Sequence, residues 1–312
     1  MDHNDGCGFS GQVAAPMTGY RGRFAPSPSG RLHFGSLVAA LGSWLFARAA
    51  GGRWIVRMED LDREREAPGA ADAILQTLHG FGLESDEAVI CQSKRNTAYR
   101  AALERLTAAD DAYACWCSRS DLEPFGSLHP QHCVATARTG RAPAWRLRVP
   151  DEELAFDDAI QGSQQQNLRR DVGDFVIWRV EGNASYQLAV VVDDAAQGIT
   201  DIVRGADLLD STARQLLLQR RLGLPQPNYA HLPLALGSDA RKLSKHEHAL
   251  PVEAAKPLPA LRAALAFLGQ PVSDARHPNA LLCDALRDFD AAKIPRSAAA
   301  AAPYAALRKD VC

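Results

Sequence analysis

The sequence predicts an α/β protein built around a parallel sheet. Short apolar segments of strand type alternate with longer segments of helical period, and this alternation is typical of βαβ units. The first unit begins with a strand candidate at 21–24, turns at Pro-Ser-Pro-Ser-Gly (26–30) and continues as a helix from His33. Between Leu37 and Arg48 the large apolar residues recur every three or four positions, as on one face of a buried helix.

Later segments repeat this pattern. The run 54–58 (Trp-Ile-Val-Arg-Met) predicts a second strand. Segments 145–149, 175–180 and 186–192 predict a β-rich region, after which strand and helix alternate again. The remaining predicted elements are helices at 70–79, 96–108, 211–222 and 258–268 and strands at 199–204 and 229–236.

Composition excludes several classes of protein. With 312 residues, of which 46% are hydrophobic and 23% charged, the chain is long enough for one large domain or two. A formal net charge of −2 gives no general attraction to nucleic acid, so any RNA contact requires a local basic surface. Neither a membrane-spanning run nor a secretion signal is present, and we expect a cytoplasmic monomer without a membrane partner.

The segment 21–36 is suited to binding an anion. At a strand–turn–helix junction, free backbone N–H groups and the positive end of the helix dipole face the same point. The two prolines of the turn fix φ, and Gly30 allows a ligand to approach the backbone closely. Taken alone, the same pattern also fits an ordinary βα turn with a surface histidine.

A cysteine-rich window predicts a metal site. Three of the seven cysteines fall within it, namely Cys115, Cys117 and Cys133, and His129 stands four residues before the last. Three thiolates and one imidazole complete a tetrahedral shell and leave no position for water, so we expect one structural Zn²⁺ per chain. An odd number of clustered cysteines in a reducing compartment favours metal over disulfides. His132 is the second choice for the imidazole, and reduced cysteines without metal are the alternative.

A second basic motif lies far along the chain. Lys242-Leu243-Ser244-Lys245 follows a predicted strand and a polar Gly-Ser-Asp turn. Two lysines on a polar loop can follow the negative charge that develops on a phosphoryl group. A solvated basic loop is the alternative if this motif is considered alone.

Together these motifs resemble the class I aminoacyl-tRNA synthetases. The run His33-Phe34-Gly35-Ser36 is similar to the first nucleotide motif of that class, and 242–246 to the second. Segments 23–30, 57–62 and 201–205 are similar to glutamyl-tRNA synthetases, which carry a long anticodon-binding region at their C-terminus. Here only 246–312 follows Lys245. This short form with a Cys-x-Cys…Cys insert resembles the glutamyl-queuosine tRNA(Asp) synthetases.

The resemblance implies the domain organisation. It predicts a Rossmann-type catalytic domain of the class I synthetases, an inserted zinc-containing α+β subdomain and a short helical C-terminal region. The expected boundaries are a flexible leader at 1–19, two halves of the catalytic domain at 20–110 and 186–250, the zinc-binding subdomain at 111–185 and the C-terminal region at 251–312.

The resemblance also implies the site residues. Two arginines would match the two carboxylates of glutamate, and an acidic side chain would match its α-ammonium. The implied glutamate-binding residues are Arg23, Phe24, Ala25, Pro26, Ser27, Glu59, Tyr186 and Arg204. The implied ATP-binding residues are His33, Gly35, Ser36 and Lys245, and His33, Lys242 and Lys245 are the implied catalytic residues. Asp193 and Asp194 are further candidates for orienting the amino acid or a base.

Three positions depart from the usual pattern. Ser36 stands where the first motif has histidine, so contact with phosphate there must be weaker or come from the backbone. His246 stands where the second motif has serine. His129 occupies a ligand position that tolerates tyrosine in the family, and histidine is the better ligand for zinc.

The implied activity is that of a ligase acting in two steps. The family activates L-glutamate with ATP without tRNA, releases pyrophosphate, and transfers the glutamyl group to queuosine at the wobble position of tRNA(Asp). Expected partners are therefore ATP, L-glutamate and queuosine-modified tRNA(Asp), with Mg²⁺ arriving on the nucleotide. A shortened glutamyl-tRNA synthetase that charges a tRNA 3′ end, and a catalytically silent, zinc-stabilised RNA-binding paralogue, are the alternatives.

Overall fold

A mostly parallel sheet forms the centre of the molecule. The computed structural model describes residues 19–126, 128–135, 140, 142–236, 252–296 and 299–300. Two groups of strands are hydrogen-bonded in the orders β1-β2-β3 and β7-β6-β10-β9, and within them β6 and β7 are antiparallel while all the other pairs are parallel. The strands are β1 (Arg21–Phe24), β2 (Arg53–Met58), β3 (Ile90–Cys91), β6 (Glu153–Asp158), β7 (Gly162–Asn167), β9 (Asp201–Gly205) and β10 (Asn228–Leu232).

The two groups meet where β1 lies beside β9. The backbone N–H of Thr200 donates to the carbonyl of Arg21 at 3.0 Å, and the N–H of Arg21 donates to Thr200 Oγ1 at 2.7 Å. The neighbours of β1 are therefore β2, which follows it in the chain, and β9, which comes much later. Such a reversal of strand order opens a crevice at the carboxyl ends of the strands, which is where ligands bind in open α/β sheets.

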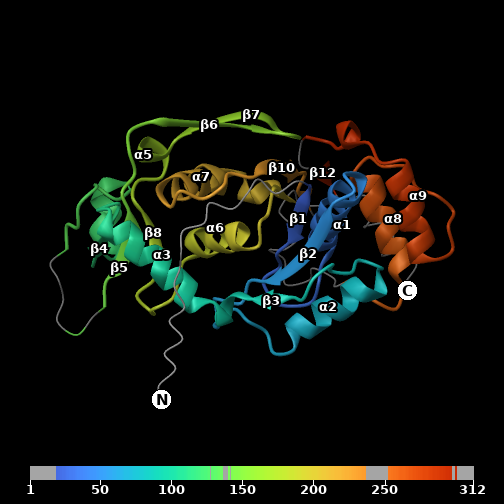
Figure 1. Cartoon of the computed structure of the whole chain (residues 1–312), viewed down its shortest axis with the longest axis horizontal. Coiled ribbons are helices and arrows are strands. Elements are labelled where there is room, and N and C mark those ends of the chain that lie inside the picture. Colours follow the sequence, from blue (N-terminus) through green and yellow to red (C-terminus); the bar gives the residue numbers. More distant parts are fainter. Residues whose placement is uncertain are drawn as a thin grey trace, which may run out of the picture.

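Helices cover both faces of this sheet (Figure 1). One face packs on α1 (Phe34–Ala49), which in turn contacts α8 (Pro257–Phe267) and α9 (Pro278–Arg287). The other face carries α7 (Thr212–Arg221), whose Leu216 clusters with Ile55 and Ile202 from the sheet.

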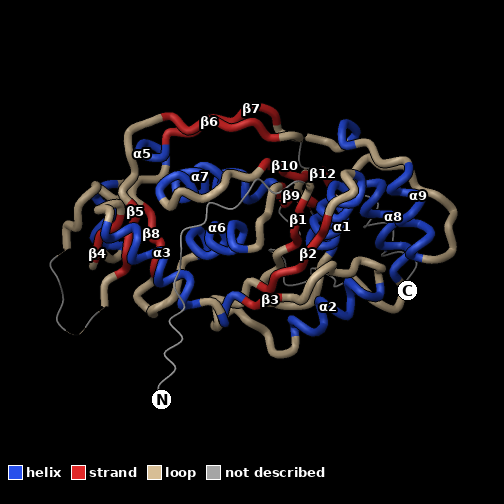
Figure 2. Tube along the Cα trace, viewed as in Figure 1, coloured by secondary structure: helices blue, strands red, loops and turns tan. Residues whose placement is uncertain are grey.

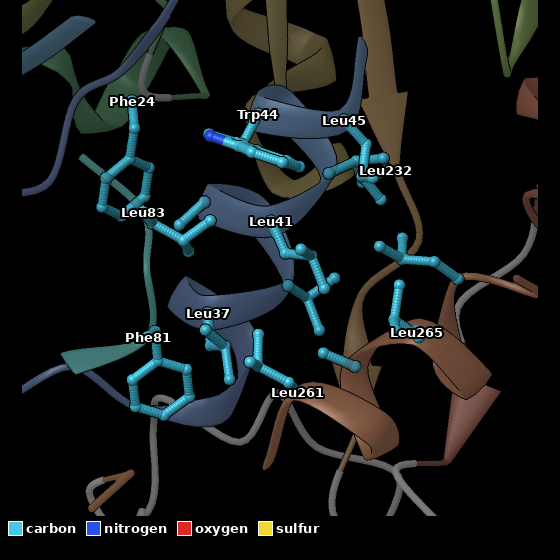
Figure 3. Packing of buried hydrophobic residues seen from close by; sticks show 14 of the residues in the cluster. Phe24, Leu37, Leu41, Trp44, Leu45, Phe81, Leu83, Leu232, Leu261 and Leu265 are labelled. Carbon is cyan, nitrogen blue, oxygen red and sulfur yellow. The ribbon is translucent and has the colours of Figure 1, made fainter. Parts of the chain in front are cut away.

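The hydrophobic core around α1 fixes the position of this helix and of the β1–α1 turn before it (Figure 3). Leu37, Leu41 and Leu45 are fully buried along one side of the helix, and Leu261 and Leu265 of α8 meet them. Each fully buried leucine contributes about 1.5–3 kcal/mol relative to exposure. The N-terminus of α1 is therefore fixed relative to the strand ends.

The predicted subdomain 111–185 has two parts in the structure (Figure 2). Strands β4 (Ala112–Cys115), β5 (Ala144–Leu147) and β8 (Phe175–Trp178) form a separate antiparallel sheet. The β6–β7 hairpin instead extends the main sheet, because β6 pairs with β10. This hairpin carries Asp158 to the side of His231.

One predicted strand is wrong. Residues 186–192 belong to the helix α6 (Tyr186–Ala196), which is buried along most of its length. A helix with apolar surroundings on most sides shows no polar face, so its period cannot be recognised in the sequence. Tertiary packing here outweighs the weak preference of valine for strands.

Four further α-helices and one further strand pair lie in the described part of the chain. The long helices among them are α2 (Ala70–Gly80) and α3 (Asn96–Ala108), and the short ones are α4 (Arg119–Leu122) and α5 (Leu168–Asp171). β11 (Ala235–Leu236) pairs with β12 (Ala299–Ala300). Within the described part of the chain, no helix combines the length and the apolar character needed to cross a bilayer.

Candidate active site and metal centre

A cavity of about 910 Å³ opens at the carboxyl ends of β1, β2, β9 and β10. Its walls come from the β1–α1 turn, the residue after β2, the start of α6 and the ends of β9 and β10. Every implied glutamate-binding residue lines it, together with His33, Gly35 and Ser36. Residues predicted from separate parts of the sequence thus surround one space.

The N-terminus of α1 forms one wall. His33 is the N-cap residue, and its Nδ1 accepts the Ser36 backbone N–H at 3.3 Å while its Nε2 lies 3.0 Å from Ser36 Oγ. A Cβ at position 35 would lie 3.3 Å from His33 Cε1, so glycine leaves room for the imidazole. The first turn of α1 contains no acidic residue, so the positive end of its dipole remains available to an anion. Ser36 therefore orients His33 in addition to facing the cavity.

Backbone hydrogen bonds fasten the β1–α1 turn to the loop after β2. The Pro26 carbonyl accepts the Glu59 N–H, and the Pro28 carbonyl accepts the Ala67 N–H, both at 2.9 Å. Proline lacks an N–H but keeps its carbonyl, so both prolines of the turn still accept hydrogen bonds. The first contact places Glu59 directly beside the turn.

A buried carboxylate organises the arginines beneath the cavity. Asp194 Oδ1 accepts from Arg23 Nε at 3.1 Å and from Arg57 Nη1 at 2.8 Å. Arg57 also donates to Glu59 Oε1 at 3.1 Å, and its side chain is fully buried. Asp193 accepts hydrogen bonds from Gln92, Arg95 and Tyr99.

Sequence reasoning missed the part played by Arg57. Neither Asp193 nor Asp194 lines the cavity, although we expected them to orient the amino acid or a base. They hold arginines in position instead. The available signal was an arginine inside an apolar strand, between Val56 and Met58, since such a residue is buried only when it is paired.

Two carboxyl groups in this network differ in their proton affinity. Burial raises the pKa of Glu59 above its ordinary value, although Arg57 and Arg23 act in the opposite direction. Burial alone would also raise the pKa of Asp194, but Arg23 and Arg57 outweigh it and hold that pKa below its ordinary value. Asp194 therefore stays ionised to a lower pH than Glu59 does.

Arg204 lines the cavity from β9, and its hydrogen-bond partners differ from those of Arg23. Its guanidinium donates to His231 Nε2 at 3.0 Å, to Gln215 Oε1 at 2.8 Å and to Thr212 Oγ1 at 2.9 Å. None of these acceptors is a carboxylate. Tyr186, at the start of α6, lines the same cavity.

The two catalytic lysines implied by the resemblance, Lys242 and Lys245, lie outside the described residues, as does His246. The described residues on either side of 237–251 are close to the cavity. Ala235 lines it, and the N–H of Val252 donates to the carbonyl of Leu32, another lining residue.

A second candidate site is a cluster of three thiols. The sulfur atoms of Cys115, Cys117 and Cys133 all lie within 4.8 Å of one another, so the cluster could bind a metal. Cys117 Sγ and Cys133 Sγ are 3.6 Å apart. Burial raises the pKa of the Cys115 thiol to about 11.

His129 adjoins this cluster without joining the group of three. Its Nε2 lies 3.1 Å from Cys115 Sγ, and its Nδ1 lies 2.8 Å from the hydroxyl of Tyr113. That hydroxyl donates its proton to Asp174 Oδ2 at 2.7 Å, so it accepts the proton on Nδ1. Burial, and then Arg146, lower the pKa of His129 to about 4. The imidazole is thus neutral, with the lone pair of Nε2 directed at the thiols, as a metal ligand requires.

Comparison with known proteins identifies the family. The model of the family "tRNA synthetases class I (E and Q), catalytic domain" matches residues 20–127 and 124–266. A glutamyl-Q tRNA(Asp) synthetase from Xanthomonas axonopodis pv. citri is 56% identical over 286 residues, which are 90% of this chain and 94% of the relative. The chain belongs to the glutamyl-Q tRNA(Asp) synthetase family.

Other members of the family agree with this assignment. The protein of the same name from Burkholderia cenocepacia is 57% identical and covers 80% of this chain, with 88% of its own length matched. The one from Ectopseudomonas mendocina is 53% identical, with 90% and 96% covered. The resemblance seen in the sequence motifs is therefore confirmed, as is the α/β fold of class I synthetases.

Among solved structures, a glutamate tRNA ligase from Elizabethkingia meningosepticum, in complex with its amino acid, is similar to this chain. The TM-score is 0.74 at 26% identity, and the match covers 90% of this chain and 66% of the ligase. The chain therefore spans about two thirds of that ligase, but more than nine tenths of the Xanthomonas glutamyl-Q synthetase.

Replacing Asp194 by asparagine tests the role of the buried carboxylate. We expect Asp194→Asn to lower the free energy of unfolding at pH 7 by about 3–5 kcal/mol, because it leaves the buried Arg23 guanidinium without its carboxylate and leaves Arg57 with Glu59 as its remaining hydrogen-bonded carboxylate. The folded-state pKa of Asp194 is depressed, so its contribution is present above the unfolded pKa of about 3.9 and is lost as the pH falls through the lower folded value. Urea denaturation across this pH range measures both effects.

Asp157→Asn is the matched control, since Asp157 is exposed on β6 and its replacement should change stability by less than about 0.5 kcal/mol. A loss for Asp194→Asn that stayed the same size below pH 3 would contradict the ion-pair account.

Proposed function

We propose that this chain activates L-glutamate with ATP, without tRNA, and then transfers the glutamyl group to queuosine at the wobble position of tRNA(Asp). The observation that carries the proposal is that the side chains of Arg23, Arg204 and Glu59 and the N-terminus of α1 line one and the same cavity. Membership of the glutamyl-Q tRNA(Asp) synthetase family supports queuosine in tRNA(Asp) as the acceptor of the glutamyl group.

Glutamate presents two carboxylates and one ammonium group. Arg23 and Arg204 would bind the carboxylates, and Glu59 would bind the α-ammonium. The depressed pKa of Asp194 supports this arrangement, because Asp194 fixes Arg23 without itself entering the cavity. Phe24, Ala25, Pro26 and Ser27, from the end of β1 and the turn after it, line the same cavity, as does Tyr186 at the start of α6.

ATP would place its phosphates at the N-terminus of α1. His33, Gly35 and Ser36 lie there. Lys242 and Lys245 would contact the phosphates, because the described residues before and after 237–251 lie near the cavity. The α-carboxylate of glutamate attacks the α-phosphorus in line and pyrophosphate leaves. Such a reaction needs mainly positioning and charge stabilisation, with Mg²⁺ brought by the nucleotide.

In the second step, a hydroxyl of the cyclopentenediol ring of queuosine would attack the activated carbonyl, and AMP would leave.

We further propose that the thiol cluster holds one structural Zn²⁺, with Cys115, Cys117, Cys133 and His129 as ligands. The neutral state and the Nδ1–H tautomer of His129 support the fourth ligand. Bound zinc would fix the loop after β4 to the segment 128–135. This role is structural, since four protein ligands leave no open position.

The proposed function is tested by two linked assays. Glutamate-dependent exchange of pyrophosphate into ATP should proceed without tRNA, and radiolabelled glutamate should then appear on tRNA(Asp) only if the tRNA contains queuosine. Exchange that required tRNA(Glu), with label on its 3′ end, would indicate a shortened glutamyl-tRNA synthetase. Absence of exchange with every amino acid would favour the catalytically silent paralogue.

Metal analysis tests the zinc site. The purified protein should contain close to one equivalent of zinc, and Cys117→Ser should reduce it severalfold, because three ligands hold the metal less tightly than four. Cys283→Ser is the matched control, since Cys283 is an exposed free thiol on α9. Zinc content that is unaffected by Cys117→Ser would contradict the ligand assignment.

A further inference from the structure

A chain of three buried side chains leads from the cavity wall into the main sheet. Arg204 Nε donates to His231 Nε2 at 3.0 Å, and His231 Nδ1 lies 2.5 Å from Asp158 Oδ2. Each side chain comes from a different strand: β9, β10 and β6. Of the three only Arg204 lines the cavity, and His231 is fully buried.

The donor and the acceptor are fixed for both hydrogen bonds that link Arg204, His231 and Asp158. Asp158 Oδ1 accepts the backbone N–H groups of Ile160, Gln161 and His231 at 3.0, 2.8 and 3.1 Å. Oδ2 is left to accept from His231, so the imidazole carries its proton on Nδ1. The lone pair of Nε2 then accepts the N–H of Arg204.

The charge states agree with this arrangement. Burial opposes ionisation of Asp158, but the hydrogen bonds from His231 and from the backbone hold the pKa of Asp158 below its ordinary value. Burial lowers the pKa of His231. A neutral imidazole therefore separates the carboxylate from the guanidinium.

Arg204 is consequently held without being neutralised. Its other N–H groups donate to Gln215, Thr212 and the carbonyl of Leu208, none of which is charged. Arg23 differs, because Asp194 pairs with it directly. The hydrogen-bond partners of Arg204 among the described residues thus include no carboxylate, which leaves its charge without a directly paired anion and suited to a substrate carboxylate.

We infer that Asp158 and His231 are positioning residues for glutamate, which set the His231 tautomer and through it the orientation of Arg204. This inference rests on the proposed function, because it assigns Arg204 to a carboxylate of the amino acid. Tyr229 supports the same geometry, since its ring stacks on His231 at 6.2 Å and lies under the Arg204 guanidinium at 5.6 Å.

Asp158→Asn separates this role from a structural one. The asparagine carbonyl would keep the three backbone N–H groups that now bond to Oδ1, so the turn after β6 should remain folded. Its amide nitrogen would then face His231 Nδ1 and force the ring proton onto Nε2. Two N–H donors, from His231 and Arg204, would oppose each other, and the guanidinium would move.

The experiment measures KM in tRNA-independent ATP–pyrophosphate exchange. Asp158→Asn should raise the KM for glutamate about tenfold or more, the usual size for a lost hydrogen bond to a charged group. The KM for ATP should stay within about twofold, because the phosphate wall does not depend on Arg204. Asp157→Asn, the exposed neighbour on β6, should leave both constants unchanged.

Two further measurements give independent readouts. Nitrogen NMR of the His231 ring should report the Nδ1–H tautomer in the wild type and the Nε2–H tautomer in Asp158→Asn. In a His231→Gln background, the glutamine carbonyl accepts from Arg204 whatever occupies position 158. Asp158→Asn should therefore add no further rise in the KM for glutamate there.

An unchanged KM for glutamate in Asp158→Asn, or equal rises in the KM for glutamate and for ATP, would overturn the inference while wild-type exchange remains normal. A wild-type protein without any glutamate-dependent exchange would overturn the proposed function and this inference together.

Discussion

The buried carboxylate of Asp194 is the interaction on which the cavity depends. It stands on α6 and holds Arg23 from β1 and Arg57 from β2, three segments that meet only at the reversal of strand order. Arg57 passes the constraint on to Glu59, whose backbone is also fixed to the β1–α1 turn. Burying a charge is expensive unless it is paired, so the network forms completely or the site does not form.

The same cavity presents two arginines that differ in whether a carboxylate pairs with them. Arg23 is paired with a carboxylate, whereas Arg204 is held by a neutral imidazole, an amide and a hydroxyl. A guanidinium without a directly paired carboxylate favours an anionic ligand group over its neutral amide counterpart. A site with this difference is suited to an amino acid that carries a second carboxylate, and it gives a physical basis for preferring glutamate to glutamine.

Local patterns in the sequence were sufficient to predict many residues that line the cavity. They were not sufficient to predict the buried residues that hold those side chains in position. The strand–turn–helix at 21–36 and the clustered cysteines were predicted because their residues are neighbours in the chain. The pairing of Asp194 with Arg23 and of His231 with Asp158 could not be predicted, because these partners lie 171 and 73 residues apart and become neighbours only through the strand order. The buried run after Tyr186 was read as a strand for a related reason: a segment apolar on most sides carries no period.

A crystal structure with a stable glutamyl-adenylate analogue, in which a sulfamate replaces the acyl phosphate, tests the central claim most directly. We expect one analogue molecule in the cavity at the strand ends. Its side-chain carboxylate should lie within hydrogen-bond distance of Arg204 or Arg23, and its sulfamate should lie at the N-terminus of α1 beside His33. An analogue bound elsewhere, or one whose carboxylates contact neither arginine, would contradict the account.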